Sequence, residues 1–173
     1  MTKFKDVTLA MDLSLNGPGF AVLAVEPTTN KPIALEVSSL NNTRIKTHGE
    51  KLSVIQAEIK RLLDTYKPKH IVREKGFSRF AATTQALFKV VGVADLTLYK
   101  HGHKATPKEI APTSVKKIVT GNGKSSKEDV QTAVMQALQI EDENYFANDD
   151  ESDAAAVGLA YLVKNERIDN LGE

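Results

Sequence analysis

Residues 9–22 read LAMDLSLNGPGFAV and give the clearest indication of the fold. Apolar runs over residues 7–13 and 20–25 flank a segment rich in Asn, Gly and Pro, the residues that form turns. The pattern predicts two strands joined by a short turn. Residues 32–40 alternate between apolar and polar or small side chains, which predicts a third, half-buried strand. The chain is therefore expected to open with three antiparallel strands.

Beyond these strands, helical and extended patterns alternate. Helices are predicted over residues 48–66, 81–95, 112–119, 125–138 and 149–164, and short strands over residues 70–74 and 96–99. Ser125 followed by Glu128 predicts a capping box at the start of the fourth helix. The order of elements predicts an α/β fold, in which a mixed sheet of three antiparallel strands followed by parallel strands carries helices on both faces.

Length and composition exclude several classes of protein. A chain of 173 residues is expected to form one domain over residues 1–173, and 41% apolar with 26% charged residues is an ordinary globular composition. The absence of cysteine excludes a disulfide framework, a thiolate zinc site and a cysteine nucleophile, and it suits a reducing cytoplasm. No stretch resembles a signal peptide or a membrane span, so no membrane partner is expected.

The net charge of +1 hides an uneven distribution along the chain. Residues 60–127 carry fifteen Lys and Arg against four acidic residues, whereas residues 128–173 carry twelve acidic residues against two basic ones. A basic segment of this size is typical of a protein that binds a polyanion. The same charges could instead solvate helix faces, and charge alone leaves both interpretations open.

Four carboxylates occupy positions where an acidic residue is unexpected. Asp12 lies near the end of the most apolar strand, Glu74 ends another strand, and Asp150 and Asp153 share one face of the last helix. Together they could hold hard divalent cations, which prefer oxygen ligands. The alternatives are a turn opened by Asp12, a surface ion pair at Glu74 and an N-terminal helix cap, the last being the better interpretation for Asp149 and Glu151.

Four segments, in order along the chain, resemble the motifs of the RuvC family of Holliday junction resolvases. They are residues 9–22, 71–80 (IVREKGFSRF), 111–127 (APTSVKKIVTGNGKSSK) and 150–160 (DESDAAAVGLA). They match an Asp before a turn, a strand-ending Glu with Phe three residues later, a segment with Pro, Val-Lys and Gly-x-Gly, and a closing helix with small residues after its last acid. Because they span nearly the whole chain, their combination is specific.

The resemblance implies a ribonuclease H-like fold and metal-dependent cutting of branched DNA. Asp12, Glu74, Asp150 and Asp153 match the catalytic, metal-binding positions. Lys116 and Lys127 match basic positions near the scissile phosphate, and Lys116 is expected to be catalytic. Two Mg²⁺ ions per active site, with Mn²⁺ as a substitute, would support phosphodiester hydrolysis that leaves a 5′-phosphate and a 3′-hydroxyl. Four-way junctions are the expected substrate, and forks and flaps stay open as further substrates.

The resemblance also implies residues that contact DNA and a second subunit. Phe77 matches an aromatic residue placed against the opened junction, although it could instead form a hydrophobic staple before the next helix. Further DNA-binding candidates are Arg79, Lys116, Lys117, Lys124 and Lys127. A homodimer is expected because a four-way junction is two-fold symmetric. The helix over residues 81–95 matches the dimer helix through Ala82, Ala86, Val90, Val91 and Ala94, although this stripe could be buried within one chain.

Other interpretations remain beside the nuclease. Gly123-Lys124-Ser125 resembles the end of a phosphate-binding P-loop, but that motif needs Gly where this chain has Ile118. The alternative from another class is a protein that binds branched DNA without cutting it. Because the acidic last third lacks the basic extension of many relatives, docking to a branch-migration motor is not expected. A stand-alone protein of a bacterium, or of a phage in its host's cytoplasm, is expected instead.

Overall fold

A five-stranded mixed sheet forms the centre of the computed structural model, which describes residues 3–76 and 78–172. Its strands are β1 (Lys5–Asp12), β2 (Gly19–Val25), β3 (Pro32–Ser39), β4 (His70–Glu74) and β5 (Lys108–Ile110), in the order β3-β2-β1-β4-β5. Strand β2 pairs antiparallel with both β1 and β3, whereas β4 pairs parallel with both β1 and β5. The predicted mixed sheet is confirmed.

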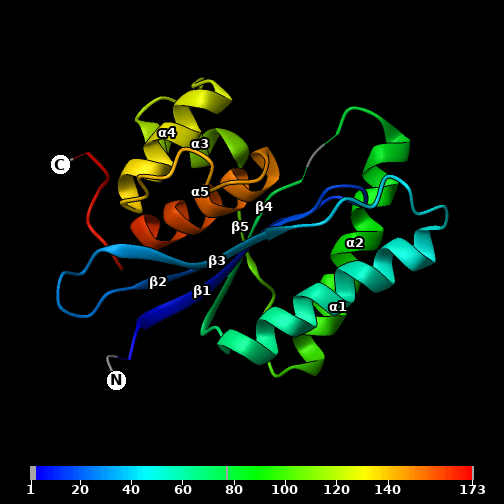
Figure 1. Ribbon diagram of the computed structural model, residues 1–173. Helices are drawn as coiled ribbons and strands as arrows, with labels where there is room; N and C mark the ends of the chain where they lie inside the picture. Colours follow the sequence, from blue (N-terminus) through cyan, green and yellow to red (C-terminus); the bar gives the residue numbers. More distant parts are fainter. Residues whose placement is uncertain (1–2, 77, 173) are drawn as a thin grey trace.

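Helices cover both faces of this sheet (Figure 1). They are α1 (His48–Tyr66), α2 (Ala81–Lys100), α3 (Pro112–Thr120), α4 (Lys127–Ala137) and α5 (Asp149–Lys164). Side chains alternate along a strand, so Leu9 and Met11 pack towards α1 and α2, whereas Ala10 packs towards α5. Two hydrophobic cores result, one on each face of the sheet. None of the helices in the described ranges is long and apolar enough to cross a membrane.

The predicted strand over residues 96–99 is wrong, because these residues form the last turn of α2. Val90, Ala94, Thr97 and Leu98 are buried on one face of this helix, and burial at helical spacing continues to its end. The fifth strand is instead β5, whose first two residues are exposed and whose third, Ile110, is buried. The element order is as predicted, but the strand that follows α2 lies further along the chain.

The predicted capping box at the start of α4 is displaced by one residue. Ser126, not Ser125, is the N-cap, and its hydroxyl accepts a hydrogen bond from the backbone N–H of Asp129. The Asp129 carboxylate in turn accepts from the backbone N–H of Ser126. The side chain of Ser125 is buried instead and donates to the carbonyl of Asn122 at 2.9 Å. This pairing fixes the short connection between α3 and α4.

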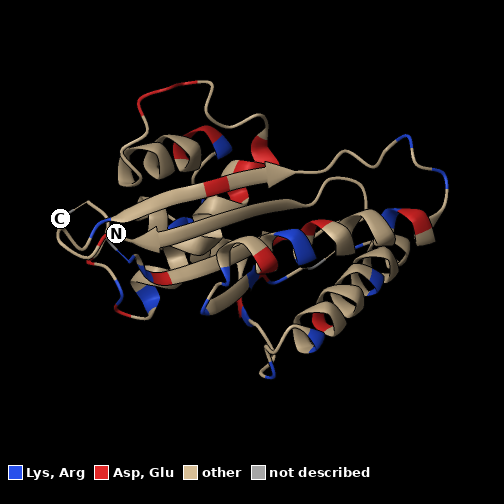
Figure 2. Cartoon of the chain, turned by 60° about the horizontal axis from the view of Figure 1, so that its bottom comes forward, with Lys and Arg blue, Asp and Glu red and all other residues tan. Residues whose placement is uncertain are grey.

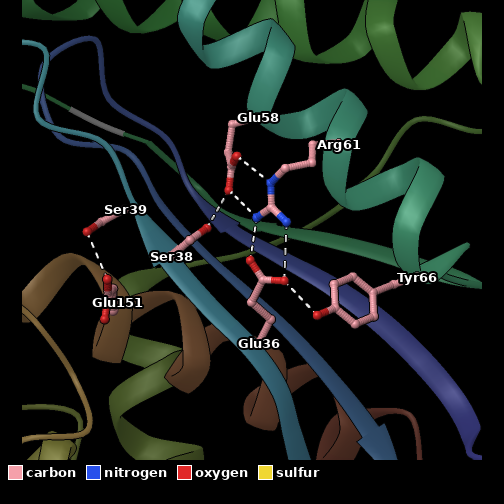
Figure 3. Close-up of polar contacts among 7 residues, drawn as sticks. All are labelled: Glu36, Ser38, Ser39, Glu58, Arg61, Tyr66 and Glu151. Atoms are coloured by element: carbon pink, nitrogen blue, oxygen red, sulfur yellow. Dashed lines mark hydrogen bonds and ion pairs between the residues drawn. The ribbon is translucent and has the colours of Figure 1, made fainter.

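Polar contacts tie the edge strand β3 to helices on both faces of the sheet (Figure 3). On the α1 side, Arg61 pairs with Glu36 and Glu58, and its guanidinium lowers the pKa of both carboxyls. On the other side, the Ser39 hydroxyl donates to the carboxylate of Glu151 in α5 at 3.0 Å. The edge strand is therefore connected directly to the first turn of α5.

Candidate active site

Asp12 and Glu74 lie side by side at one edge of the sheet. They end β1 and β4, which are parallel neighbours with Met11 opposite Arg73, so the carboxyl ends of both strands meet at this edge. Two residues before each acid, Ala10 and Val72 belong to the core beneath α5. Because side chains two residues apart share a face, both carboxylates point to the α5 side.

The first turn of α5 is held in place by its own capping contacts. Asn148 is the N-cap, and its side chain accepts from the backbone N–H of Glu151 at 3.2 Å. The Glu151 carboxylate accepts from the backbone N–H of Ala147 at 2.9 Å as well as from Ser39. The capping interpretation of Glu151 is confirmed, and it explains why this acid is buried away from Asp12.

Asp150 and Asp153 project from this turn towards the sheet edge. A Cβ atom at Gly17 would lie 3.0 Å from the Asp150 carboxylate, so this side chain rests on the turn that follows β1. Asp153 and Glu74 line one pocket of about 280 Å³ together with Lys116 and Lys127. The structure therefore brings all four predicted acids to one edge of the sheet.

Close packing of backbone brings α5 to this edge. Gly19 is the first residue of β2 and pairs with Asp12, and a Cβ atom at this position would lie only 1.9 Å from the backbone carbonyl oxygen of Asp150. Side chains larger than hydrogen therefore do not fit between β2 and the start of α5. Sequence reasoning placed Gly19 in a turn and missed this contact with a residue far along the chain.

Burial and mutual repulsion make the four carboxylates unusually hard to ionise. Burial raises the pKa of Asp12 to about 6, with further contributions from Asp153 and Asp150. Burial also raises the pKa of Glu74 to about 7, followed by the charges of Asp12 and Asp153. The pKa values of Asp150 and Asp153 are raised as well, mainly by burial. When all four carboxylates are ionised, the site therefore concentrates negative charge in a partly buried position.

Two lysines offset only part of this charge. The Lys127 amine lies 3.6 Å from the Asp153 carboxylate and 3.5 Å from that of Asp149, and the charge of Asp153 raises the pKa of Lys127. Lys116 lines the same pocket and lowers the pKa of Glu74. Both of the basic residues expected near the scissile phosphate therefore lie beside the acids.

The other predicted DNA-binding residues lie outside this pocket. Lys117 on α3, Lys124 before α4 and Arg79 before α2 are exposed. Phe77 lies outside the described residues. Figure 2 shows acidic residues on the loop before α5 and on its first turn, whereas Lys and Arg are spread over α1, α2 and the connecting loops. The basic excess of the middle segment is therefore not confined to the four-acid edge.

The donor chemistry of this edge fits a hard divalent cation. Four carboxylates supply oxygen ligands, and a bound cation would stabilise their ionised forms, which burial and the neighbouring acids disfavour at Asp12 and Glu74. Within the described ranges, no three Asp, Glu or His side chains are grouped tightly enough to hold an ion as they stand. Binding would therefore draw the carboxylates of Asp12, Glu74, Asp150 and Asp153 closer together.

Glu74→Gln is expected to change how stability depends on pH in the metal-free protein. Because the pKa of Glu74 is raised from 4.5 to about 7 by folding, its stabilising contribution is complete below about pH 4.5 and is lost as the pH rises through about 7. Between about pH 5 and about pH 8, the wild type should lose about 1–3 kcal/mol more unfolding free energy than Glu74→Gln. Urea unfolding in EDTA measures the difference, and parallel losses in both proteins would contradict it.

A cluster of buried acids beside two lysines suits one type of ligand, the phosphodiester backbone of a nucleic acid. The lysines can bind the phosphate, while the acids hold the cations that hydrolysis of such a stable bond requires. On an α/β sheet with antiparallel strands followed by parallel ones, this chemistry defines a nuclease of the ribonuclease H-like type.

Comparisons with known proteins give the family. The family model described as crossover junction endodeoxyribonuclease RuvC matches residues 8–161. A relative of that name from a Synechococcus species is 30% identical over 152 residues, covering 87% of this chain and 94% of the relative. Another from Prochlorococcus marinus subsp. pastoris is 29% identical over 154 residues, covering 89% and 94%. The chain belongs to the RuvC family.

A solved structure agrees in fold. Thermus thermophilus RuvC, in a complex with a Holliday junction substrate, superimposes with a TM-score of 0.80 at 20% identity, covering 95% of this chain and 99% of that one. The ribonuclease H-like fold predicted from the motifs is thus confirmed. The family match also confirms the predicted enzyme class, a crossover junction endodeoxyribonuclease, and endonucleases of this family depend on metal ions.

Proposed function

We propose that this protein resolves Holliday junctions by paired nicks in opposing strands. One observation carries the proposal: Asp12, Glu74, Asp150 and Asp153 are all acidic, and the fold brings them to one edge of the sheet. A protein that only binds branched DNA has no need for buried carboxylates that repel one another and the phosphates of its ligand.

The lysines of the site bind the phosphate, and the acids of the site serve its hydrolysis. Lys116 and Lys127 bind and orient the phosphate that is cut, because both line the pocket that Glu74 and Asp153 also line. The four acids would hold two Mg²⁺ ions, with Mn²⁺ as a substitute. Bound divalent cations would activate a water molecule and stabilise the leaving oxygen. The products carry a 5′-phosphate and a 3′-hydroxyl.

Cleavage of a synthetic four-way junction tests this function. The protein is incubated with end-labelled junction in Mg²⁺, in Mn²⁺ or in EDTA, and the strands are separated on a denaturing gel. Paired nicks that require metal support a resolvase. Tight binding without cleavage in either metal would instead indicate a protein that binds branched DNA without cutting it. Forks, flaps and linear duplex, tested in parallel, define the range of substrates.

We also propose that the active protein is a homodimer formed through α2. Of the stripe predicted to form this interface, Val90 and Ala94 are buried in the core and Ala86 and Val91 are partly buried against it, which leaves Ala82 as its exposed member. A different face of α2 is exposed and apolar. It carries Phe88, Leu96 and Tyr99, which are 64%, 50% and 55% exposed. A second copy that covers this face would give two active sites related by a two-fold axis, which matches the two-fold symmetry of a junction.

Phe88→Glu is expected to convert the dimer to a monomer. A charge at Phe88, the most exposed of the three apolar residues on this face, should weaken association by at least about 30-fold, the loss of one interface hot spot. Light scattering after gel filtration measures the mass. Phe4→Glu is the matched control, because Phe4 is also exposed but lies just before β1. An unchanged mass for Phe88→Glu at low protein concentration would contradict the interface.

A further inference from the structure

We propose that the groove on the α1 and α2 side of the catalytic edge is a second phosphate-binding subsite, with Lys51 as its principal contact. The subsite would hold a phosphate of the cut strand a few nucleotides from the scissile bond. This inference rests on the proposed nuclease function and goes beyond it, because it assigns the path of the DNA strand across the protein.

The groove is continuous with the catalytic carboxylates. It has a volume of about 560 Å³, and its lining includes Asp12, Glu74, His48 and Lys51. The pocket of Lys116 and Lys127 shares Glu74 and Pro112 with it. The carboxylates therefore lie between two hollows, one beneath α3 to α5 and the other at the amino-terminal ends of α1 and α2. A strand cut at these acids must leave the site on both sides, and the groove provides the second exit.

Lys51 is held in this groove by a rigid turn. Its amine donates to the side-chain oxygen of Asn16 at 2.6 Å. The carbonyl of Asn16 accepts from the backbone N–H of Asn42 at 2.8 Å, and the Asn42 side chain donates to the carbonyl of Leu15 at 3.2 Å. Asn42 is only 2% exposed, so this support is buried. The amine is thus fixed relative to Asp12 by the turn that begins there.

The charged groups of the groove suit a phosphate. Apart from the two catalytic acids, the charged or titratable residues of its described lining are His48, Lys51 and Lys75. Lys89, on α2, lies with its amine 3.1 Å from the His48 ring nitrogen and adds a further positive charge. Lysine amines bind phosphate as point charges without sequence preference. A basic groove at the exit of an acidic site would offset the repulsion between the catalytic acids and the strand.

A thermodynamic cycle between protein and DNA tests the subsite. Junction affinity is measured without cleavage, in Ca²⁺ in place of Mg²⁺, for the wild type, Lys51→Ala and Lys51→Arg. Each is tested against junctions that carry one neutral methylphosphonate at successive positions on either side of the cut. Lys60→Ala is the control, because Lys60 is exposed on the same helix but does not line the groove. Thermal unfolding confirms that each variant is folded, and Lys51→Gln replaces the Ala variant if it is not.

Lys51→Ala should bind the unmodified junction about 3- to 10-fold more weakly near 0.1 M salt, and its plot of log affinity against log salt should be shallower by about 0.9. A methylphosphonate at one position, on one side of the cut only, should weaken junction binding by the wild type but not by Lys51→Ala. Lys51→Arg should restore sensitivity at that position. Equal sensitivity of the wild type and Lys51→Ala at every position would overturn the subsite and leave Lys51 as a support for the turn. A wild type that binds but never cuts in Mg²⁺ or Mn²⁺ would overturn the proposed function instead.

Discussion

Asp12→Asn is expected to lower the rate of junction cleavage by on the order of 10³-fold or more, while junction affinity stays within about threefold of the wild type. The amide has the shape of the carboxylate but lacks its charge, so it would bind a divalent cation at the end of β1 much more weakly. With a pKa of about 6 even in the absence of metal, Asp12 is mostly ionised at neutral pH. Its charge is therefore present in the working enzyme. Single-turnover cleavage and gel-shift affinity, measured on the same preparations, separate the two effects.

Asp149→Asn is the matched control for this experiment. Asp149 lies in the same first turn of α5 as Asp150, but its side chain is 61% exposed and contacts Lys127 rather than the other acids. Exposed ion pairs of this kind contribute little, so cleavage by Asp149→Asn should stay within about threefold of the wild type. A large loss of cleavage in both variants would mean that the total negative charge of the edge matters rather than the position of Asp12. Retained cleavage by Asp12→Asn would refute the catalytic assignment.

Gly19→Ala is expected to damage both stability and cleavage. The added methyl group would lie 1.9 Å from the Asp150 carbonyl oxygen. No change of side-chain rotamer can relieve this contact, because both partners are held by the backbone. Either β2 or the first turn of α5 must move, at a cost of about 2–4 kcal/mol in unfolding free energy. The shift would carry Asp150 away from Asp12 and slow cleavage by at least about 10-fold. Urea unfolding and single-turnover cleavage measure the two losses.

Gly49→Ala provides the comparison, since an added Cβ atom at this position in α1 meets nothing within 4 Å. Alanine favours a helix over glycine by up to about 1 kcal/mol, so this variant should be as stable as the wild type or slightly more stable, with unchanged cleavage. If Gly19→Ala behaved like Gly49→Ala, the close approach of α5 to β2 would not matter for the site.

Local patterns in the sequence predicted most of the sheet and its helices. Strands β1 to β3 and helix α5 carry clear apolar runs or alternation over seven or more residues, and their bounds agree closely with the prediction. Strand β5 was missed because it has three residues, of which only Ile110 is buried. Its place in the sheet depends on pairing with β4, a tertiary contact that no local pattern encodes. The same limit explains why the end of α2 was predicted as a strand.

The parts of the candidate site that lie in sequence motifs were predictable, whereas the parts that depend on packing between distant segments were not. The four acids follow from a motif and from polar residues at strand ends, and the structure brings them together. The exposed α2 face was not predicted, because Phe88 and Val90 are equally apolar in the sequence and only packing against α1 decides which of them is buried. The roles of Gly19 and Asn42 depend on partners far along the chain, so no short segment reveals them.

The catalytic edge combines β1, the first strand, with α5, the last helix of the described chain. Asp12 and Asp153 are separated by most of the sequence, and α5 packs directly on the sheet that positions Asp12. During synthesis, a growing chain that has not yet released α5 carries Asp12 and Glu74 without their two acidic partners. A prematurely terminated chain is in the same state. A chain without α5 is therefore expected to have no nuclease activity, because the site gains its last two acids only when α5 has been synthesised and has packed on the sheet.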